Sequence, residues 1–148
     1  MRESDLARLE SALTELNRQP SLGAFGEVAV GLERSAYIIL GKLHRDGPQS
    51  IGQLADAFGL DQSTVNRQTA AMVRSGLIER IADPDGGIAR KFVATEDGVS
   101  RFTEHRDWRS EALGRVLSDW SREELGAFAA MLERFTGDLD DQRRCATD

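Results

Sequence analysis

The sequence contains little cysteine and histidine and no long apolar run, and each shortage excludes a class of protein. Its single cysteine, Cys145, rules out an internal disulfide framework. Its two histidines, His44 and His105, do not stand at the spacing of a zinc site, so we expect no metal ion or other cofactor. No apolar run approaches the ~18 residues of a transmembrane helix, and residues 1–10 do not resemble a secretory signal. We therefore expect a cytoplasmic protein with no membrane partner.

The short motifs on which many enzyme sites are built are also missing. The sequence has no glycine-rich loop that could cradle a phosphate and no nucleophile elbow. Cys145 lies in a polar tail without a second cysteine to resolve an oxidised thiol, which argues against a redox switch. We therefore expect no catalytic residue, and the sequence favours a binding function.

The chain has the length and composition of one globular domain. A chain of 148 residues can bury roughly 70% of the surface that it exposes when extended. Its content of 40% hydrophobic and 30% charged residues is ordinary for a globular protein. We find no internal repeat or low-complexity linker, so residues 1–148 are assigned to a single domain. Only the last eight residues are expected to be disordered.

Residues 61–74 have the pattern of a helix with one buried side and one polar side. The buried side is predicted from residues at helical spacing, which are Val65, Thr69, Met72 and Val73. The other side presents hydroxyl, amide and guanidinium groups among small neighbours, and such groups suit hydrogen bonds to base edges and phosphates. Taken alone, the polar face of a helix more often meets only water. Whether residues 61–74 bind DNA must therefore be judged together with the neighbouring segments.

The preceding segment predicts a second helix joined by a tight turn. Ser50 and Gln53 have the spacing of a capping box, and Gly59 is a typical helix stop. The apolar face of this helix is formed by Ile51, Leu54, Ala55 and Phe58. Asp61 can then cap the next helix with its carboxylate, while Leu60 and Val65 supply apolar contacts between the two helices. The pattern is that of a helix-turn-helix unit.

A β-hairpin is predicted directly after this unit. Residues 77–82 and 90–95 are short strand candidates on either side of a turn rich in proline and glycine. A helix-turn-helix followed by a hairpin is a winged helix. The fold class is therefore mainly α with a small β-hairpin wing, flanked by further helices.

Several short motifs in this region resemble the multiple-antibiotic-resistance regulator (MarR) family. They are STVNR at residues 63–67, SGLIER at 75–80, DPD at 83–85 and ATEDG at 94–98. The resemblance implies a dimeric, sequence-specific transcription regulator, most often a repressor that small phenolic or aromatic acids release from DNA. It also implies a palindromic operator, with the two recognition helices about one helical turn, ~34 Å, apart.

The sequence departs from the family pattern at two places. Members commonly have an aspartate and an arginine at the wing tip, where this chain has Gly86, Gly87 and Ile88, so Arg90 is the candidate substitute. Gln68 stands where an apolar residue is usual on the recognition helix. It either lies at the edge of the core or rotates the exposed face slightly.

The net charge of −6 argues against a simple nucleic-acid binder, but the positive charge is local. Residues 62–91 contain five cationic side chains and only three carboxylates. Phosphate attraction depends on the potential within a Debye length of ~8 to 10 Å, so a positive segment in an acidic chain can still bind DNA. The predicted DNA-contacting residues are Ser50, Gln62, Ser63, Thr64, Asn66, Arg67, Ala70, Arg74, Arg90 and Lys91.

An alternative function is a winged helix that binds protein or serves as an assembly scaffold. Its core pattern would be the same. A protein-binding version should expose apolar anchors where this sequence has Ser63, Asn66 and Arg67.

Three further amphipathic helices exceed what a small winged-helix core needs. Leucines repeat along residues 4–18, and apolar residues mark helices at about 95–118 and 121–139. We expect residues 4–18 and 96–140 to form a homodimer interface. The winged-helix part spans about residues 28–98, and its first helix is predicted over residues 28–45.

The middle of the helix at 95–118 is unusually polar. Arg101, His105, Arg106 and Arg109 interrupt the apolar seam around Trp108, so this portion either faces solvent or lines a polar cavity. Tyr37 and His44 are most simply packing residues. We nevertheless name Tyr37, Trp108 and Arg109 as candidates for binding a small effector, because a guanidinium can pair with a carboxylate.

Overall fold

The computed structural model describes residues 2–20 and 32–146 and shows a mainly helical chain with one small hairpin. The helices are α1 (Arg2–Arg18), α3 (Arg34–Asp46), α4 (Ile51–Phe58), α5 (Gln62–Arg74), α6 (Glu96–Val116) and α7 (Arg122–Cys145). The strands are β1 (Ile78–Ile81) and β2 (Lys91–Ala94). The predicted fold class, a winged helix-turn-helix with flanking helices, is confirmed. In the described ranges no helix is long and apolar enough to cross a membrane.

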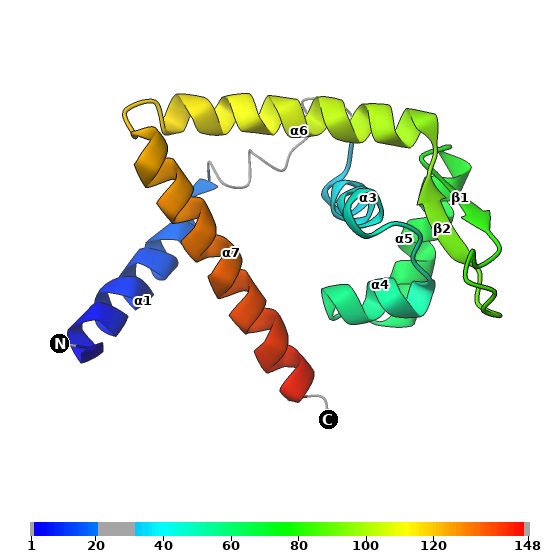
Figure 1. Ribbon diagram of the computed structural model, residues 1–148, viewed down its shortest axis with the longest axis horizontal. Coiled ribbons are helices and arrows are strands. Elements are labelled where there is room, and N and C mark those ends of the chain that lie inside the picture. Colours follow the sequence, from blue (N-terminus) through cyan, green and yellow to red (C-terminus); the bar gives the residue numbers. More distant parts are fainter. Residues whose placement is uncertain (1, 21–31, 147–148) are drawn as a thin grey trace.

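The elements from α3 to β2 form a small unit that we call the head (Figure 1). α6 begins at the wing and leads away from the head, and after a short turn α7 runs back toward it. α1 lies at the end of the molecule opposite the wing. The head is therefore attached to two long helices that extend well beyond it.

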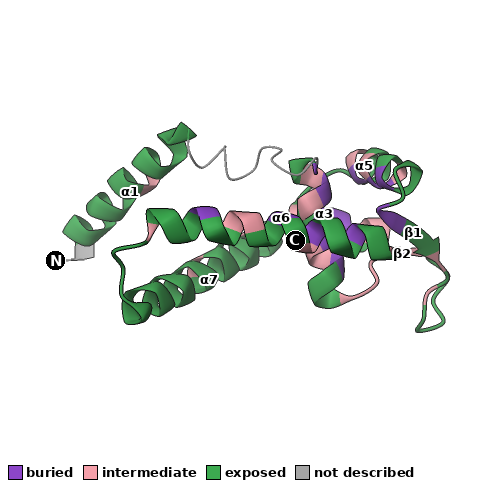
Figure 2. Ribbon diagram, turned by 90° about the horizontal axis from the view of Figure 1, so that it is seen from above, coloured by how far each residue is buried: buried purple, intermediate pink, exposed green. Residues whose placement is uncertain are grey.

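The hydrophobic core lies in the head and under the first half of α6. Leu54 and Val65 are fully buried where α4 crosses α5, and Leu40 and Phe92 tie α3 to the hairpin. Figure 2 shows the buried residues gathered in this part, whereas α1 and α7 are exposed along almost their whole length. Among residues 2–20 and 32–146 there is thus one core, and α1 and α7 contribute little to it.

The hairpin pairs in a simple antiparallel register. Ile78 lies opposite Ala94, and Ile81 lies opposite Lys91. A third segment joins the sheet at one point, because Gln49 and Phe92 exchange both backbone hydrogen bonds, at 3.2 and 2.8 Å. This bridge fixes the connection between α3 and α4 to the wing.

Most of the predicted helix ends around the helix-turn-helix are confirmed. The Ser50–Gln53 capping box is present, and Gly59 ends α4 in the left-handed conformation with φ +63°. Asp61 is the N-cap residue of α5, but its side chain makes no capping hydrogen bond, so that part of the prediction was wrong.

Two apolar positions predicted to be buried are exposed instead. Val73 is 40% exposed, since at 100° per residue it lies about 80° around the helix from Val65, whereas Met72 lies about 20° away. Leu60 is 41% exposed, because it follows the glycine turn and points to the edge of an open cleft. The contact between α4 and α5 rests on Leu54, Ala55 and Val65.

Two helix limits also differ from the prediction. The described part of the first winged-helix segment is extended at Leu32 and Glu33, and α3 begins only at Arg34. Periodicity could not reveal this, because Leu32 is buried and keeps helical spacing with Ala36. Residues 28–31 of the predicted helix lie outside the described residues. At the other end, α7 continues to Cys145, so most of the tail expected to be disordered is helical.

The junction between the hairpin and α6 is closely packed. The Thr95 hydroxyl accepts from the Gly98 N–H at 3.1 Å, which caps α6, and donates to the carbonyl of Gly76. Gly98 is buried against the Leu77 carbonyl so closely that any side chain on it would overlap this oxygen. The absence of a side chain at Gly98 therefore allows the first turn of α6 to pack directly against the backbone of Leu77.

We expect Gly98→Ala to lower the free energy of unfolding by about 1 to 3 kcal/mol, because the added methyl group must displace the backbone of Leu77. Gly52→Ala is the control, since Gly52 lies in α4 with only ordinary van der Waals neighbours around a new Cβ. This control should be neutral or stabilising by up to about 1 kcal/mol. Chemical denaturation at equal protein concentration measures both. Equal stability of the two variants would contradict the account of the junction.

Candidate nucleic-acid interface

The recognition helix α5 is anchored on one side and free on the other. Val65, Thr69 and Met72 are buried, and the Thr69 hydroxyl is satisfied within the helix by the carbonyls of Val65 and Asn66, at 2.9 and 3.1 Å. The predicted contact residues on the opposite side are exposed or half-buried: Gln62, Ser63, Thr64, Asn66, Arg67, Ala70 and Arg74. α5 contains two arginines and no carboxylate. Its free face is therefore polar and positive.

Gln68 is half-buried on the side of α5 that lies next to α3. Of the two arrangements that the sequence left open, this placement favours a polar side chain at the edge of the core. The amide group can reach the solvent from there, so the core does not have to turn α5 to accommodate it.

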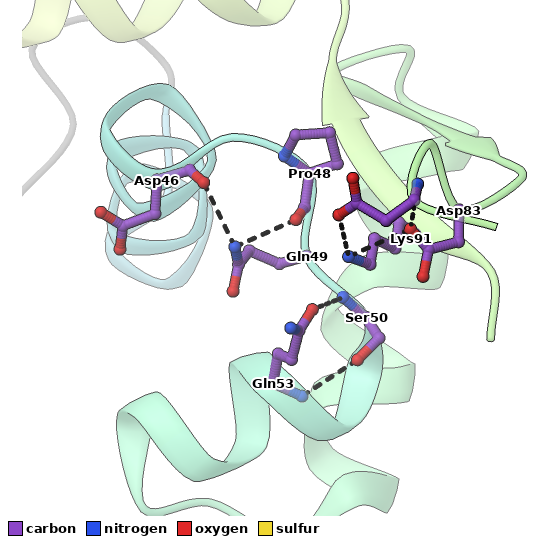
Figure 3. A network of polar contacts seen from close by, with 8 residues as sticks. Asp46, Pro48, Gln49, Ser50, Gln53, Asp83 and Lys91 are labelled. Carbon is purple, nitrogen blue, oxygen red and sulfur yellow. Dashed lines mark hydrogen bonds and ion pairs between the residues drawn. The ribbon is translucent and has the colours of Figure 1, made fainter. Parts of the chain in front are cut away.

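Ser50 lies at the N-terminus of α4 and is already engaged in the capping box. Its Oγ accepts from the Gln53 N–H at 3.1 Å, and the Gln53 side chain accepts from the Ser50 N–H at 2.9 Å (Figure 3). Because the hydroxyl oxygen is the acceptor in this pair, its proton remains available to a phosphate oxygen. Capping and a backbone contact are thus compatible at this residue.

The wing is held together by an ion pair that the sequence did not suggest. The Lys91 ammonium lies 3.3 Å from Asp83 and 4.0 Å from Asp85, and the side chains of Lys91 and Asp83 are only 13% and 12% exposed (Figure 3). Asp83 also accepts from the Asp85 N–H at 2.9 Å, and this bond, with the nearby Lys91 charge, holds the pKa of the Asp83 carboxyl below its usual value. Lys91 therefore stabilises the wing turn, and its charge is largely matched by carboxylates.

The other cations of the wing are more accessible. Arg90 is exposed and stands just before β2, so it is not part of the strand as predicted. Arg80 is also exposed, with its guanidinium 5.3 Å from the centre of the Phe92 ring on the opposite strand. At the tip, Ile88 is fully exposed. Arg80 contributes to the positive charge of residues 62–91, but the sequence analysis did not predict it as a DNA-contacting residue. Its position beside Phe92 depends on the pairing of the two strands.

The candidate effector residues gather around His105. The Tyr37 ring lies 4.7 Å from that of His105, the Arg109 guanidinium lies 5.1 Å from the Tyr37 ring, and Trp108 meets the edge of His105 at 6.1 Å. His105 is fully buried, and within the described ranges neither of its ring nitrogens has a hydrogen-bond partner. Burial, together with the charge of Arg109, lowers the pKa of His105.

This arrangement corrects the expectation for the middle of α6. Arg101 and Arg106 are exposed, but His105 points into the core, so the segment is neither a uniformly solvated face nor a simple cavity wall. A separate open cleft of about 1010 Å³ lies along another side of α3. Residues of α3, α4, α5 and α7 line it, among them Ile38, Lys42, Phe58 and Arg143.

Comparison with known proteins agrees with this geometry. The MarR family model matches residues 32–86, which include the helix-turn-helix and the first strand of the wing. A Bacillus subtilis (strain 168) protein described as the uncharacterized HTH-type transcriptional regulator YxaD is 37% identical over 103 residues, covering 70% of this chain and 72% of that protein.

Solved structures share the fold over almost the whole chain. A MarR family protein from Bacillus stearothermophilus superposes with a TM-score of 0.79 at 24% identity, covering 94% of this chain and 98% of that one. Wild-type MarR from E. coli, in its apo form, gives a TM-score of 0.66 at 14% identity over 88% and 96% of the two chains. From the sequence relationship and the shared fold we conclude that the chain belongs to the MarR family of transcriptional regulators.

Proposed function

We propose that the protein is a cytoplasmic homodimeric repressor that binds a palindromic operator and is released from it by a small effector. The observation that supports this most directly is the recognition helix, which buries Val65, Thr69 and Met72 and leaves a polar, positive face free. Among the exposed residues of α5 the large apolar side chain is Val73, at the C-terminal end beside Arg74. A surface of this kind suits base edges and phosphates better than the apolar anchors of a protein partner.

Arg67 and Arg90 should contribute to DNA binding in different ways. Arg67 lies in the middle of α5, where an arginine can bind guanine with two hydrogen bonds or hold a phosphate. Arg90 lies on the wing and is better placed for a contact with the DNA backbone or the minor groove. We expect Arg67→Ala to cost about 1 to 3 kcal/mol per half-site and to relax preference at one symmetric pair of operator positions. Arg90→Ala should weaken all sequences alike and reduce the salt slope by about one unit per lost contact.

Binding titrations at several salt concentrations, with the operator, its point variants and random duplex, separate these two outcomes. Each arginine is the control for the other, because both substitutions remove one exposed positive charge. Unchanged operator affinity of the Arg67→Ala protein would remove the basis of the proposal. An unchanged salt slope for Arg90→Ala would show that the wing does not use this residue.

The exposed apolar faces of α1 and α7 support a dimer. No residue of α7 is buried, although the helix has a row of large apolar side chains at helical spacing. Three of them, Phe128, Leu132 and Leu139, are each 45 to 49% exposed. In α1, Leu6 and Leu9 are similarly exposed. Large apolar surfaces of this kind mark interaction sites, and a second copy with the same faces would cover them by two-fold symmetry.

Leu132→Asp should weaken the dimer, since an unpaired carboxylate in an apolar interface costs several kcal/mol. It should also weaken operator binding, because a monomer cannot occupy both half-sites at once. Ala130→Asp is the matched control, because Ala130 lies on the opposite side of α7 and acquires the same charge. Sedimentation at micromolar concentration gives the oligomeric state. A wild-type protein that sediments as a monomer at micromolar concentration and binds the operator as a monomer would refute the proposed dimer.

The effector is proposed to bind beside Tyr37, Trp108 and Arg109. Here α6 packs against α3 of the head, the Tyr37 and Trp108 rings both lie against His105, and the Arg109 guanidinium lies over the Tyr37 ring. Among the described residues, the ring nitrogens of the buried His105 have no hydrogen-bond partner. An aromatic carboxylate matches that combination of groups. Release requires only that the effector prefer the conformation that cannot bind DNA, and a hundredfold preference corresponds to ~2.7 kcal/mol.

We expect Tyr37→Ala and Arg109→Ala to abolish or strongly reduce the response to aromatic carboxylates while keeping operator affinity in their absence. Benzoate and 4-hydroxybenzoate are suitable probes, and operator binding titrated against each probe gives the response. Tyr37→Phe is the control for ring packing, because it keeps the stacking and removes only the hydroxyl. If both alanine variants respond like the wild type to a probe that releases it, the effector binds elsewhere.

A further inference from the structure

The last turn of α7 makes a specific contact with the head. The two terminal nitrogens of Arg143 donate to the carbonyls of Asp56 and Ala57, in the last turn of α4, at 3.0 and 2.8 Å. Asp140, one turn earlier in α7, lies 3.2 Å from the same guanidinium and orients it. Figure 1 shows the C-terminal end of α7 approaching the end of α4. These residues are more than 80 positions apart in the sequence, so the contact is tertiary.

The contact has a clear physical basis. The last carbonyls of a helix have no partner within it, and they form the negative end of the helix dipole. A guanidinium placed there supplies both hydrogen bonds and opposite charge. Gly59 makes room for it, since a Cβ at Gly59 would stand only 2.5 Å from the Arg143 nitrogen. The glycine that ends α4 thus also leaves space for Arg143.

Arg143 provides the head with a second attachment. The first is the junction at Thr95 and Gly98, from which α6 departs. The second closes a triangle formed by the head, α6 and α7 (Figure 1). A body attached at one point can rotate about that point, whereas attachment at two separated points fixes its angle.

We propose that Arg143 is a positioning residue that fixes the orientation of the head relative to α6 and α7 and thereby sets the half-site spacing that the dimer accepts. This inference rests on the proposed function, in which two heads bind two half-sites. Each added base pair displaces and rotates a half-site, so a head held at a fixed angle discriminates between spacings and a head that rotates discriminates less.

The test compares Arg143→Ala with Arg144→Ala. Arg144 is the neighbouring residue with the same charge, and its side chain forms an exposed ion pair with Asp141, at 3.7 Å. Affinities are measured for the operator, for operators with one base pair inserted or removed between the half-sites, and for a duplex with one half-site. We expect the wild type and Arg144→Ala to bind the altered spacings about tenfold or more weakly than the operator. We define the spacing ratio as the affinity for the operator divided by the affinity for an operator of altered spacing. In Arg143→Ala the spacing ratio should fall severalfold, and the affinity for a duplex with one half-site should not change.

A second measurement does not depend on DNA. Hydrogen exchange at the end of α4, where the Gly59 and Leu60 N–H groups bond to the Ala55 carbonyl, should be faster in Arg143→Ala than in the wild type or Arg144→Ala. Arg143→Lys, which keeps the charge but not the two-pronged geometry, should give intermediate exchange and an intermediate spacing ratio.

Equal spacing ratios in the wild type and Arg143→Ala would overturn the inference, even if exchange differs, because the contact would then not set the spacing. Equal exchange rates would overturn it by showing that Arg143 does not hold α4. If Arg143→Ala fails to dimerise, the same comparisons are made with Arg143→Lys. Failure of the wild type to bind any duplex would contradict the proposed function itself, and exchange would still test the Arg143 contact.

Discussion

The rest of the structure depends on how one side of α5 packs into the core. Val65 and Thr69 are fully buried and Met72 nearly so, against residues of α3, α4 and the hairpin. Thr69 can be buried because its hydroxyl bonds to carbonyls of its own helix, so no polar group is left unsatisfied. This packing determines which residues of α5 remain outside. The side chains available to DNA follow from the anchor on the opposite face.

The wing and the long helices α1 and α7 are the other two features on which the proposed DNA binding depends. The wing is stiffened by Lys91, Asp83 and the backbone of Asp85, which organise a turn rich in glycine. The long helices α1 and α7 have exposed apolar faces and add no buried residues to the core, and apolar surface of this kind favours association. In the dimer that we propose, a second copy covers these faces and at the same time brings a second recognition helix to the same DNA.

Features determined by residues close in sequence were predictable. The capping boxes at Ser50 and Ser121, the glycine stop at Gly59 and the cap at Thr95 follow from a few adjacent residues, and all are present. The fold class followed from the order of these signals. The exposed face of α5 followed from helical spacing, apart from Val73 at its margin.

Features that depend on distant contacts were missed. The ion pair of Lys91 with Asp83 was not predicted, because the hairpin brings the two residues together. For His105 the sequence left open a solvated face or a polar cavity, whereas in the structure Tyr37 and Trp108 enclose it. The end of α7 resembled a disordered tail because Arg143 finds its partners in α4, more than 80 residues earlier. In each case a polar residue pairs with, or is enclosed by, groups that helical periodicity cannot identify.

The central claim is that the free face of α5, presented twice by a dimer, reads a specific palindromic sequence. Repeated selection of tight binders from a random duplex pool tests it directly, since no operator need be known beforehand. The account predicts enrichment of an inverted repeat whose half-site centres lie about one helical turn, ~34 Å, apart. A pool that remains random after selection, although the protein is folded and dimeric, would contradict it.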